Sequence, residues 1–225
     1  MSYRNQKRSG SLLCSRDPKA TNRRYRRDDQ GIDDLKNSVE TWFTDRPITW
    51  RLYSTIKGFD QSTMESIIAR ALSKWAAVSG LSFEKAAADA DRDDINIKIE
   101  VAAPDVLDPE FPEQNDGSQI AANASWGPGV SHRFIPVEKQ VYSGYVKFNN
   151  TSTGPASWNA NQIHNVFLHE VGHALGLGHT LTPNAIMARL MAGGGGNQDL
   201  ELGSEDITRI QGIYKPKRRV RRYQA

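Results

Sequence analysis

Hydrophobic residues in the first half of the sequence follow two different spacings. Over 48–53, apolar and polar residues alternate, as expected for a half-buried β-strand. Over 64–78, apolar residues recur at intervals of three or four, which predicts an amphipathic helix. Ser62 and Glu65 have the spacing of a capping box at its start, and Gly80 stands where the helix should end. This part of the chain therefore predicts a strand followed by a helix.

The remaining pattern predicts more strands and two more helices. Strands are expected at 81–84, 94–101 and 142–149, and helices at 161–175 and 204–214. Ser204 should cap the last helix, with Glu205 and Asp206 in its first turn. Residues 102–136 are rich in Pro, Gly, Asn and Asp and should form mostly loop, interrupted by a short apolar piece at 119–124. The length of 225 residues suits one domain.

Charge is distributed unevenly, although the net charge is only +3. Residues 1–27 hold nine Arg and Lys and one acidic residue, a net charge of +8, and residues 215–225 have a net charge of +6. The body between them, 28–214, has a net charge of −11. We interpret the chain as an acidic globular domain between two basic tails. The tails either remain solvated and unstructured, bind nucleic acid or an anionic membrane, or serve processing or targeting.

The sequence contains no visible export signal and no means of forming a disulfide within the chain. Its single cysteine, Cys14, excludes an internal disulfide. No apolar run is long enough to span a membrane, and the apolar patch at 12–14 is shorter than the core of a signal peptide. We therefore expect an intracellular, non-classically exported or virus-associated protein that acts as a monomer.

Candidate chemistry is concentrated in one segment, with the sequence HEVGHALGLGH. His169 and His173 are four residues apart in a predicted helix, so both imidazoles lie on one face and can reach one metal ion. Catalytic zinc takes three protein ligands and keeps one position open. His179 can supply the third ligand if Gly176 adopts a positive φ and turns the chain back toward the metal. Glu170 can then serve as the general base that takes a proton from a zinc-activated water.

These histidines also have ordinary interpretations. Two histidines on a helix can be core or surface residues, and the short H-E-x-x-H pattern arises by chance. Adding the glycine and the third histidine makes a coincidence rare, on the order of one in a hundred thousand for this length. His164 lies about 140° around the helix from the ligand face, and His132 lies in a predicted loop. We expect both to be ordinary polar residues.

The segment and the residues after it resemble the catalytic domain of the matrixins, a family of metzincin zinc peptidases (peptidase family M10). His179 is followed by a threonine, then by Pro183 and Met187, which is how matrixins place their Met-turn. Astacins and serralysins usually carry a tyrosine two residues after that methionine, where this chain has Arg189. The resemblance extends over about residues 44–214.

The resemblance implies an α+β fold of the metzincin (zincin-like) type. It would contain a twisted mixed sheet of about five strands with three helices, and zinc in the cleft below the edge strand. Met187 would form the hydrophobic floor beneath the ligands, although a plain core methionine is nearly the same structural claim. The pocket beyond it would be formed by residues 189–198. An extended polypeptide substrate is expected to pair with the edge strand. That strand consists of Ile120, Ala121, Ala122, Asn123 and Ala124.

Three positions depart from the family pattern. Matrixins usually carry a second, structural zinc ion, and calcium ions, on the strands above the cleft. Here Asn123 and Lys147 replace two histidines of that region, and Asn149 replaces an aspartate. An ammonium group cannot ligate zinc, so we expect one zinc ion (Zn2+) per chain. The replacements also weaken the case for calcium (Ca2+).

Latency in matrixins typically depends on a propeptide cysteine whose thiolate fills the open zinc position. Cys14 is the only candidate, but the arginine before it and the glycine after it in the family are missing here. Cys14 is therefore either a latency thiol or an incidental one. Residues 24–27 fit the dibasic pattern that furin-like proteases cut, and they can equally belong to the basic tail.

Two classes of function follow from these observations. The first is a zinc-dependent endopeptidase that hydrolyses peptide bonds in extended polypeptide substrates. The second is a non-catalytic structural or nucleic-acid-associated protein that uses basic tails on a vestigial protease body. Cleavage of a fluorogenic peptide that a zinc chelator abolishes and zinc restores would distinguish the two.

Overall fold

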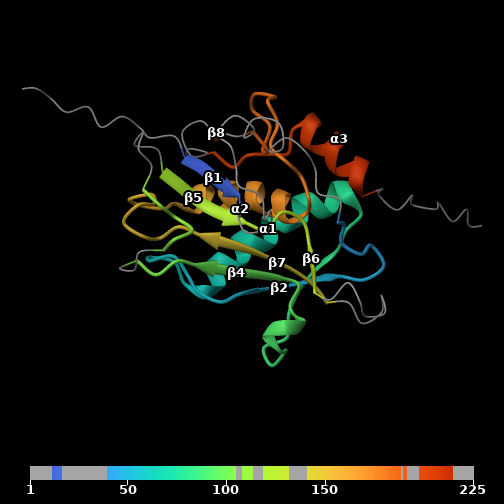
Figure 1. Ribbon diagram of the computed structural model, residues 1–225, viewed down its shortest axis with the longest axis horizontal. Coiled ribbons are helices and arrows are strands. Elements are labelled where there is room, and N and C mark those ends of the chain that lie inside the picture. The colour runs from blue at the N-terminus through green and yellow to red at the C-terminus, as the bar shows by residue number, and fades with distance from the viewer. Residues whose placement is uncertain are drawn as a thin grey trace, which may run out of the picture.

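A mixed β-sheet forms the frame of the structure, which is a computed structural model (Figure 1). It describes residues 12–16, 40–104, 108–113, 119–131, 141–188, 190–191 and 198–214. Five central strands lie in the order β3 (Phe83–Lys85), β2 (Ile48–Leu52), β4 (Ile97–Val101), β7 (Val141–Phe148) and β5 (Gln119–Ala124). β2 is parallel to β3 and β4, β4 is parallel to β7, and β5 is antiparallel to β7. The predicted mixed sheet of about five strands is confirmed.

Three further strands extend this sheet. β1 (Leu12–Arg16) is parallel to β5 and antiparallel to β8 (Leu190–Met191), and β6 (Gly129–Ser131) is antiparallel to β7. The expectation that the 1–27 tail is unstructured does not hold for the five residues of β1. An edge strand offers unpaired backbone donors and acceptors, and β1 satisfies those of β5. The rest of that tail and the whole 215–225 tail lie outside the described residues.

Helix α1 (Gln61–Ser79) has a defined cap at each end. At its start, the side chain of Asp60 accepts a hydrogen bond of 2.7 Å from a backbone N–H of the first turn. The predicted capping box of Ser62 and Glu65 is wrong, because Asp60 holds the N-cap position two residues earlier. At its end, Gly80 adopts a φ of +75°, so the predicted glycine stop is confirmed.

The other two helices also begin at defined caps. Helix α2 (Ala160–Ala174) begins with a capping box between Asn159 and Gln162, and every residue from Ile163 to its end is buried. Helix α3 (Ser204–Ile213) begins after Gly203, so the cap is one residue earlier than the expected Ser204. The three expected helices are therefore present, and α2 is the one that runs through the interior.

The main hydrophobic core lies between the sheet and helices α1 and α2, which lie behind the strands in Figure 1. Ile48, Trp50 and Leu52 project from β2 into this core, as the alternation predicts. Trp75 of α1 is fully buried, and its indole N–H donates to the carbonyl of Leu168 in α2 at 2.9 Å. Helix α2 is therefore packed against the sheet on one side and bonded to α1 on another.

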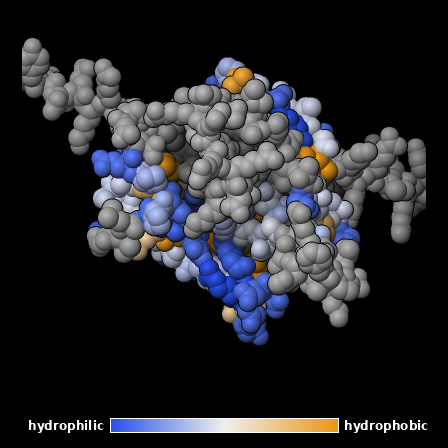
Figure 2. All heavy atoms as spheres, viewed as in Figure 1, coloured by the Kyte–Doolittle hydropathy of each residue, from blue (hydrophilic) through white to orange (hydrophobic). Residues whose placement is uncertain are grey.

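The outer surface of the described chain is mostly polar. Figure 2 shows hydrophilic residues gathered over the projection at the bottom of the view, near the short helix η3 (Arg92–Asp94). Leu181 is the exposed large hydrophobic side chain among the described residues, at 80% exposure. Within the described ranges, no helix is both long and apolar enough to cross a membrane.

Candidate metal centre

Helix α2 places the first two histidines on one buried face. His169 and His173 are 2% and 1% exposed, and their Nε2 atoms are 3.1 Å apart. One turn of helix separates the two residues, so both rings extend from the same side. The prediction that this spacing brings both imidazoles to one point is confirmed.

The chain turns sharply after α2 and returns the third histidine to the same point. Gly176 has a φ of +101°, a conformation that side chains disfavour, and its N–H donates to the carbonyl of His173 at 2.8 Å. His179 is 4% exposed, and its Nε2 lies 3.2 Å from that of His173. The ligand atoms of the three histidines all lie within 4.8 Å of one another. The glycine turn expected from the sequence is therefore present.

Backbone carbonyls orient the two helical histidines. Nδ1–H of His169 donates to the carbonyl of Ile186 at 2.6 Å, and Nδ1–H of His173 donates to the carbonyl of Leu177 at 2.7 Å. A carbonyl can only accept, so the proton must reside on Nδ1, and each Nε2 carries the lone pair that can ligate a metal. Tetrahedral zinc with bonds of about 2.0–2.1 Å requires ligand atoms about 3.3 Å apart. The donor set, its tautomers and its spacing fit a zinc ion.

The residues around the third ligand are fixed from helix α3. The guanidinium of Arg209 donates to the carbonyls of Gly178 and His179 at 3.0 and 3.1 Å. Burial lowers the pKa of Arg209, and the nearby carboxylates of Glu205 and Asp206 act in the opposite direction. Because arginine stays charged in proteins, this side chain holds the two carbonyls with a charge-assisted pair of hydrogen bonds.

Met187 lies directly against helix α2. It is fully buried, and a Cβ added to Gly172 would lie 2.4 Å from its Sδ and 3.1 Å from the ring of Trp75. Only a glycine permits this approach between helix and methionine. The sequence analysis placed Met187 near the ligands but did not explain why Gly172, between the two helical histidines, has to be small.

A buried carboxylate holds the segment before and at Met187. Asp206 is fully buried and accepts hydrogen bonds from the backbone N–H groups of Ile186 at 2.8 Å, Met187 at 3.1 Å and Gly203 at 2.9 Å. The sequence analysis treated Asp206 only as an acidic residue in the first turn of a helix. Its contact across the chain was not predictable, because no periodic pattern links it to the Met-turn.

Glu170 is a buried residue of helix α2. It follows His169 on α2 and is 1% exposed, so its carboxyl group is shielded from bulk water. A carboxyl next to a ligand on the helix can reach a group bound at the open metal position. Helix α2 therefore carries a buried candidate general base next in sequence to one of the three histidines.

The predicted substrate strand is present but does not lie at the edge. β5 holds Ile120, Ala121, Ala122, Asn123 and Ala124, all of them buried. It pairs with β7 on one side and with β1 on the other. The sequence analysis missed this second partner, since the basic composition of the N-terminal segment favoured an unfolded tail.

Cys14 lies on β1, opposite Ala122 in the register of the two strands. The backbone of the sequence-predicted latency residue is therefore next to the predicted substrate strand. Arg189 and residues 192–197 of the predicted pocket lie outside the described residues, as does His132.

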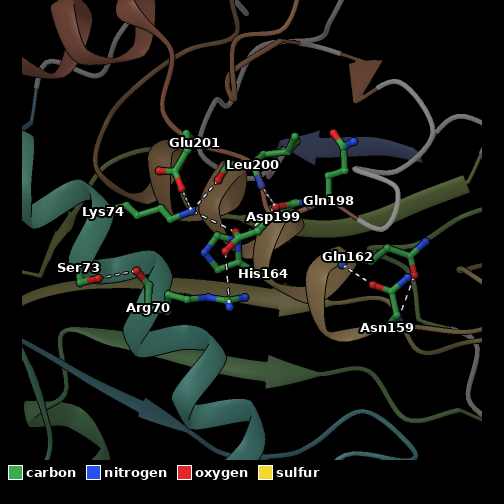
Figure 3. Close-up of polar contacts among 11 residues, drawn as sticks. Arg70, Ser73, Lys74, Asn159, Gln162, His164, Gln198, Asp199, Leu200 and Glu201 are labelled. Atoms are coloured by element: carbon green, nitrogen blue, oxygen red, sulfur yellow. Dashed lines mark hydrogen bonds and ion pairs between the residues drawn. The ribbon is translucent and has the colours of Figure 1, made fainter.

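His164 is not part of the metal centre. It is fully buried on α2, and its Nδ1 lies 2.8 Å from Asp199 Oδ1 and 3.1 Å from Asn165 Oδ1. Lys74 of α1 also binds Asp199, at 3.0 Å, and Figure 3 shows these side chains converging between α1 and α2. Burial lowers the pKa of His164, against the hydrogen bond to Asn165 and the charge of Asp199. This cluster joins the two helices to the chain at 198–201.

Comparison with known proteins gives one consistent family. The family model described as Matrixin matches residues 41–215. Human matrix metalloproteinase-25 is 30% identical over 175 residues, which cover 75% of this chain and 29% of that protein. Human matrilysin is 26% identical over 174 residues (76% and 58%), and metalloendoproteinase 1 of Glycine max is 28% identical over 158 residues (68% and 46%). The chain spans less than two thirds of the length of each of these relatives. Since the family model covers most of the chain and all three histidines, the chain belongs to the matrixin family.

Proposed function

We propose that this protein is a zinc-dependent endopeptidase that hydrolyses peptide bonds in extended polypeptides. The observation that carries the proposal is the convergence of three Nε2 atoms, two of them with their tautomer set by backbone carbonyls. The zinc ligands are His169, His173 and His179. Relatives named matrix metalloproteinase-25, matrilysin and metalloendoproteinase 1 support the same class of activity.

Glu170 is the proposed general base. When bound, zinc supplies Lewis-acid chemistry that lowers the pKa of a water molecule and polarises a carbonyl. The carboxylate of Glu170 takes the proton of the attacking water and returns it to the amine that leaves the scissile bond. Burial of Glu170 keeps competing bulk water away from this proton transfer.

The substrate is proposed to bind as an added strand on β5. Extended peptides bind exposed sheet edges through main-chain hydrogen bonds. In the structure that position is taken by β1, with Leu13 opposite Ile120 and Arg16 opposite Ala124. We therefore propose that the segment around Cys14 is an internal occupant of the substrate position, which must leave before a polypeptide can bind.

A chelation experiment tests the proposed activity. The protein should cleave a fluorogenic peptide library, lose the activity on treatment with a zinc chelator, and regain it when one equivalent of zinc is returned. Because β1 covers β5, the assay should include a variant lacking residues 1–27 as well as the full chain. If neither form cleaves any peptide in the presence of zinc, the protein is not a peptidase. The alternative of a non-catalytic, nucleic-acid-associated body would then gain support.

A further inference from the structure

Lys147 occupies a position on β7 where the family pattern has a histidine of the structural zinc region. Its Nζ lies 2.6 Å from Asp108 Oδ2 and 3.2 Å from Glu110 Oε2. The three side chains are 21%, 13% and 28% exposed, so these charges are largely shielded from solvent. An ammonium group between two carboxylates is a cation that the chain itself supplies.

The neighbouring residues do not fit a second zinc ion. Asn123 faces Lys147 across the strands, and its Oδ1 accepts a hydrogen bond from the hydroxyl of Tyr145 at 2.9 Å. Asn149 is fully buried, and its Nδ2 donates to the carbonyl of Ile120 at 2.7 Å. Amide nitrogens and an ammonium group offer no lone pair to a metal, and the amide oxygens of Asn123 and Asn149 already accept hydrogen bonds from the chain. The amide side chains therefore hold the protein's own backbone and hydroxyl groups.

Asp108, which pairs with Lys147, also shapes the turn at 108–111. Oδ1 of Asp108 accepts a hydrogen bond from the backbone N–H of Glu110 at 3.0 Å, and the carbonyl of Asp108 accepts one from the N–H of Phe111 at 2.9 Å. Phe111 is 2% exposed and packs with Ala102 and Ile120 in a second, smaller apolar cluster. The ion pair thus connects a strand of the sheet to the turn that carries this aromatic anchor.

We propose that the Lys147 ammonium takes the place of a structural metal ion, fastening the turn at 108–111 to the sheet so that this region needs no second bound metal. Burial alone would lower the pKa of Lys147, but its ion pairs with Asp108 and Glu110 outweigh burial, and the pKa lies above its ordinary value. The side chain therefore stays charged at neutral pH. This inference concerns the fold and does not depend on the proposed peptidase activity.

Thermal unfolding of the full chain tests the ion pair. Lys147→Met leaves two shielded carboxylates without their cation, so its Tm should fall by about 4–8 °C. Lys85→Met is the matched control, because Lys85 pairs with Glu65 at the surface and is 53% exposed; its Tm should change by less than about 2 °C. Adding Asp108→Asn to Lys147→Met should recover part of the loss. Glu110→Gln, a milder change, should lower Tm by about 2–4 °C even if Lys147→Met does not fold.

Metal content tests the replacement itself. After gel filtration, wild-type protein should contain no more than one zinc per chain and no tightly bound calcium, and millimolar calcium chloride should leave its Tm unchanged. Two zinc equivalents, or a calcium-induced rise in Tm of several degrees, would overturn the proposal. So would an effect of Lys147→Met no larger than that of Lys85→Met. A loss of the single zinc with the Lys147 effect intact would refute the proposed activity but leave this inference standing.

Discussion

The buried carboxylate of Asp206 should determine how firmly the Met-turn is held beneath the histidines. Its Oδ2 accepts hydrogen bonds from the N–H groups of Ile186 and Gly203, and its Oδ1 accepts one from Met187. Hydrogen bonds to a charged acceptor contribute about 1.5–3 kcal/mol each. Ile186 also provides the carbonyl that accepts from Nδ1 of His169. Removing these hydrogen bonds should therefore also loosen the position of His169, the first of the three histidines.

Two substitutions of Asp206 remove different numbers of these hydrogen bonds. Asp206→Ala removes all three hydrogen bonds, and the lower end of the range applies because the variant no longer has to bury a carboxylate. We expect a loss of about 4–5 kcal/mol from the free energy of unfolding. Asp206→Asn can keep the two hydrogen bonds to Oδ2, but its amide N–H then faces the N–H of Met187. The free energy of unfolding should therefore fall by about 1.5–3 kcal/mol. Both losses are a measurable fraction of the total stability of a typical domain, which is about 5–15 kcal/mol.

Urea unfolding followed by tryptophan fluorescence, with zinc present, measures both losses. Glu205→Gln is the matched control, since it removes an acid from the same first turn of α3 and should lose only about 0.3–1 kcal/mol through the helix dipole. Zinc should also dissociate faster from Asp206→Asn than from Glu205→Gln. If Asp206→Asn unfolds as Glu205→Gln does and holds zinc equally well, Asp206 acts only on the helix dipole and the anchoring role is refuted.

Three further predictions concern pH, latency and the tails. Burial raises the pKa of Tyr214 to about 12, so the stability it contributes should be complete below pH 10 and be lost as pH rises toward 12. Wild type should lose about 3 kcal/mol more over that interval than Tyr214→Phe, measured by urea unfolding; equal losses would contradict the assignment. Deleting residues 1–27 should raise peptide cleavage by freeing β5, and Cys14→Ser should raise it less, because the backbone pairing of β1 remains; unchanged cleavage after the deletion would exclude the occupant role. RNA binding by the full chain should weaken steeply with salt and disappear when both tails are removed, as filter binding would detect, and no binding at low salt would exclude the nucleic-acid role.

The elements and the convergence of the three histidines were predictable because each has a local cause. Helical spacing places His169 and His173 on one face, and Gly176 has the one residue type that takes its positive φ without strain. The short strand β1 near the N-terminus was not, since it depends on a distant partner rather than on its own pattern. A short segment within a basic tail can still satisfy an open sheet edge through its backbone.

Side-chain contacts between distant segments account for the rest of what the sequence did not reveal. The N-cap of α1 is Asp60 and not Ser62. Both residue types can cap a helix, and only the path of the folded chain selects one of them. Gly172 and Asp206 both help to position Met187. Gly172 leaves space for its side chain, and Asp206 accepts a hydrogen bond from its backbone N–H. Neither role leaves a periodic signal. Such contacts form only when folding brings these distant segments together around the histidine motif.

We propose that one zinc ion, held by His169, His173 and His179, acts together with Glu170 as the base. Measuring kcat and bound zinc side by side for wild type and Glu170→Ala, both lacking residues 1–27, tests this proposal. We expect about one zinc per chain in both proteins and a kcat lower by several orders of magnitude in the variant, since a base is lost and no ligand is. Near-normal turnover by Glu170→Ala, or full wild-type turnover without bound metal, would contradict the proposal.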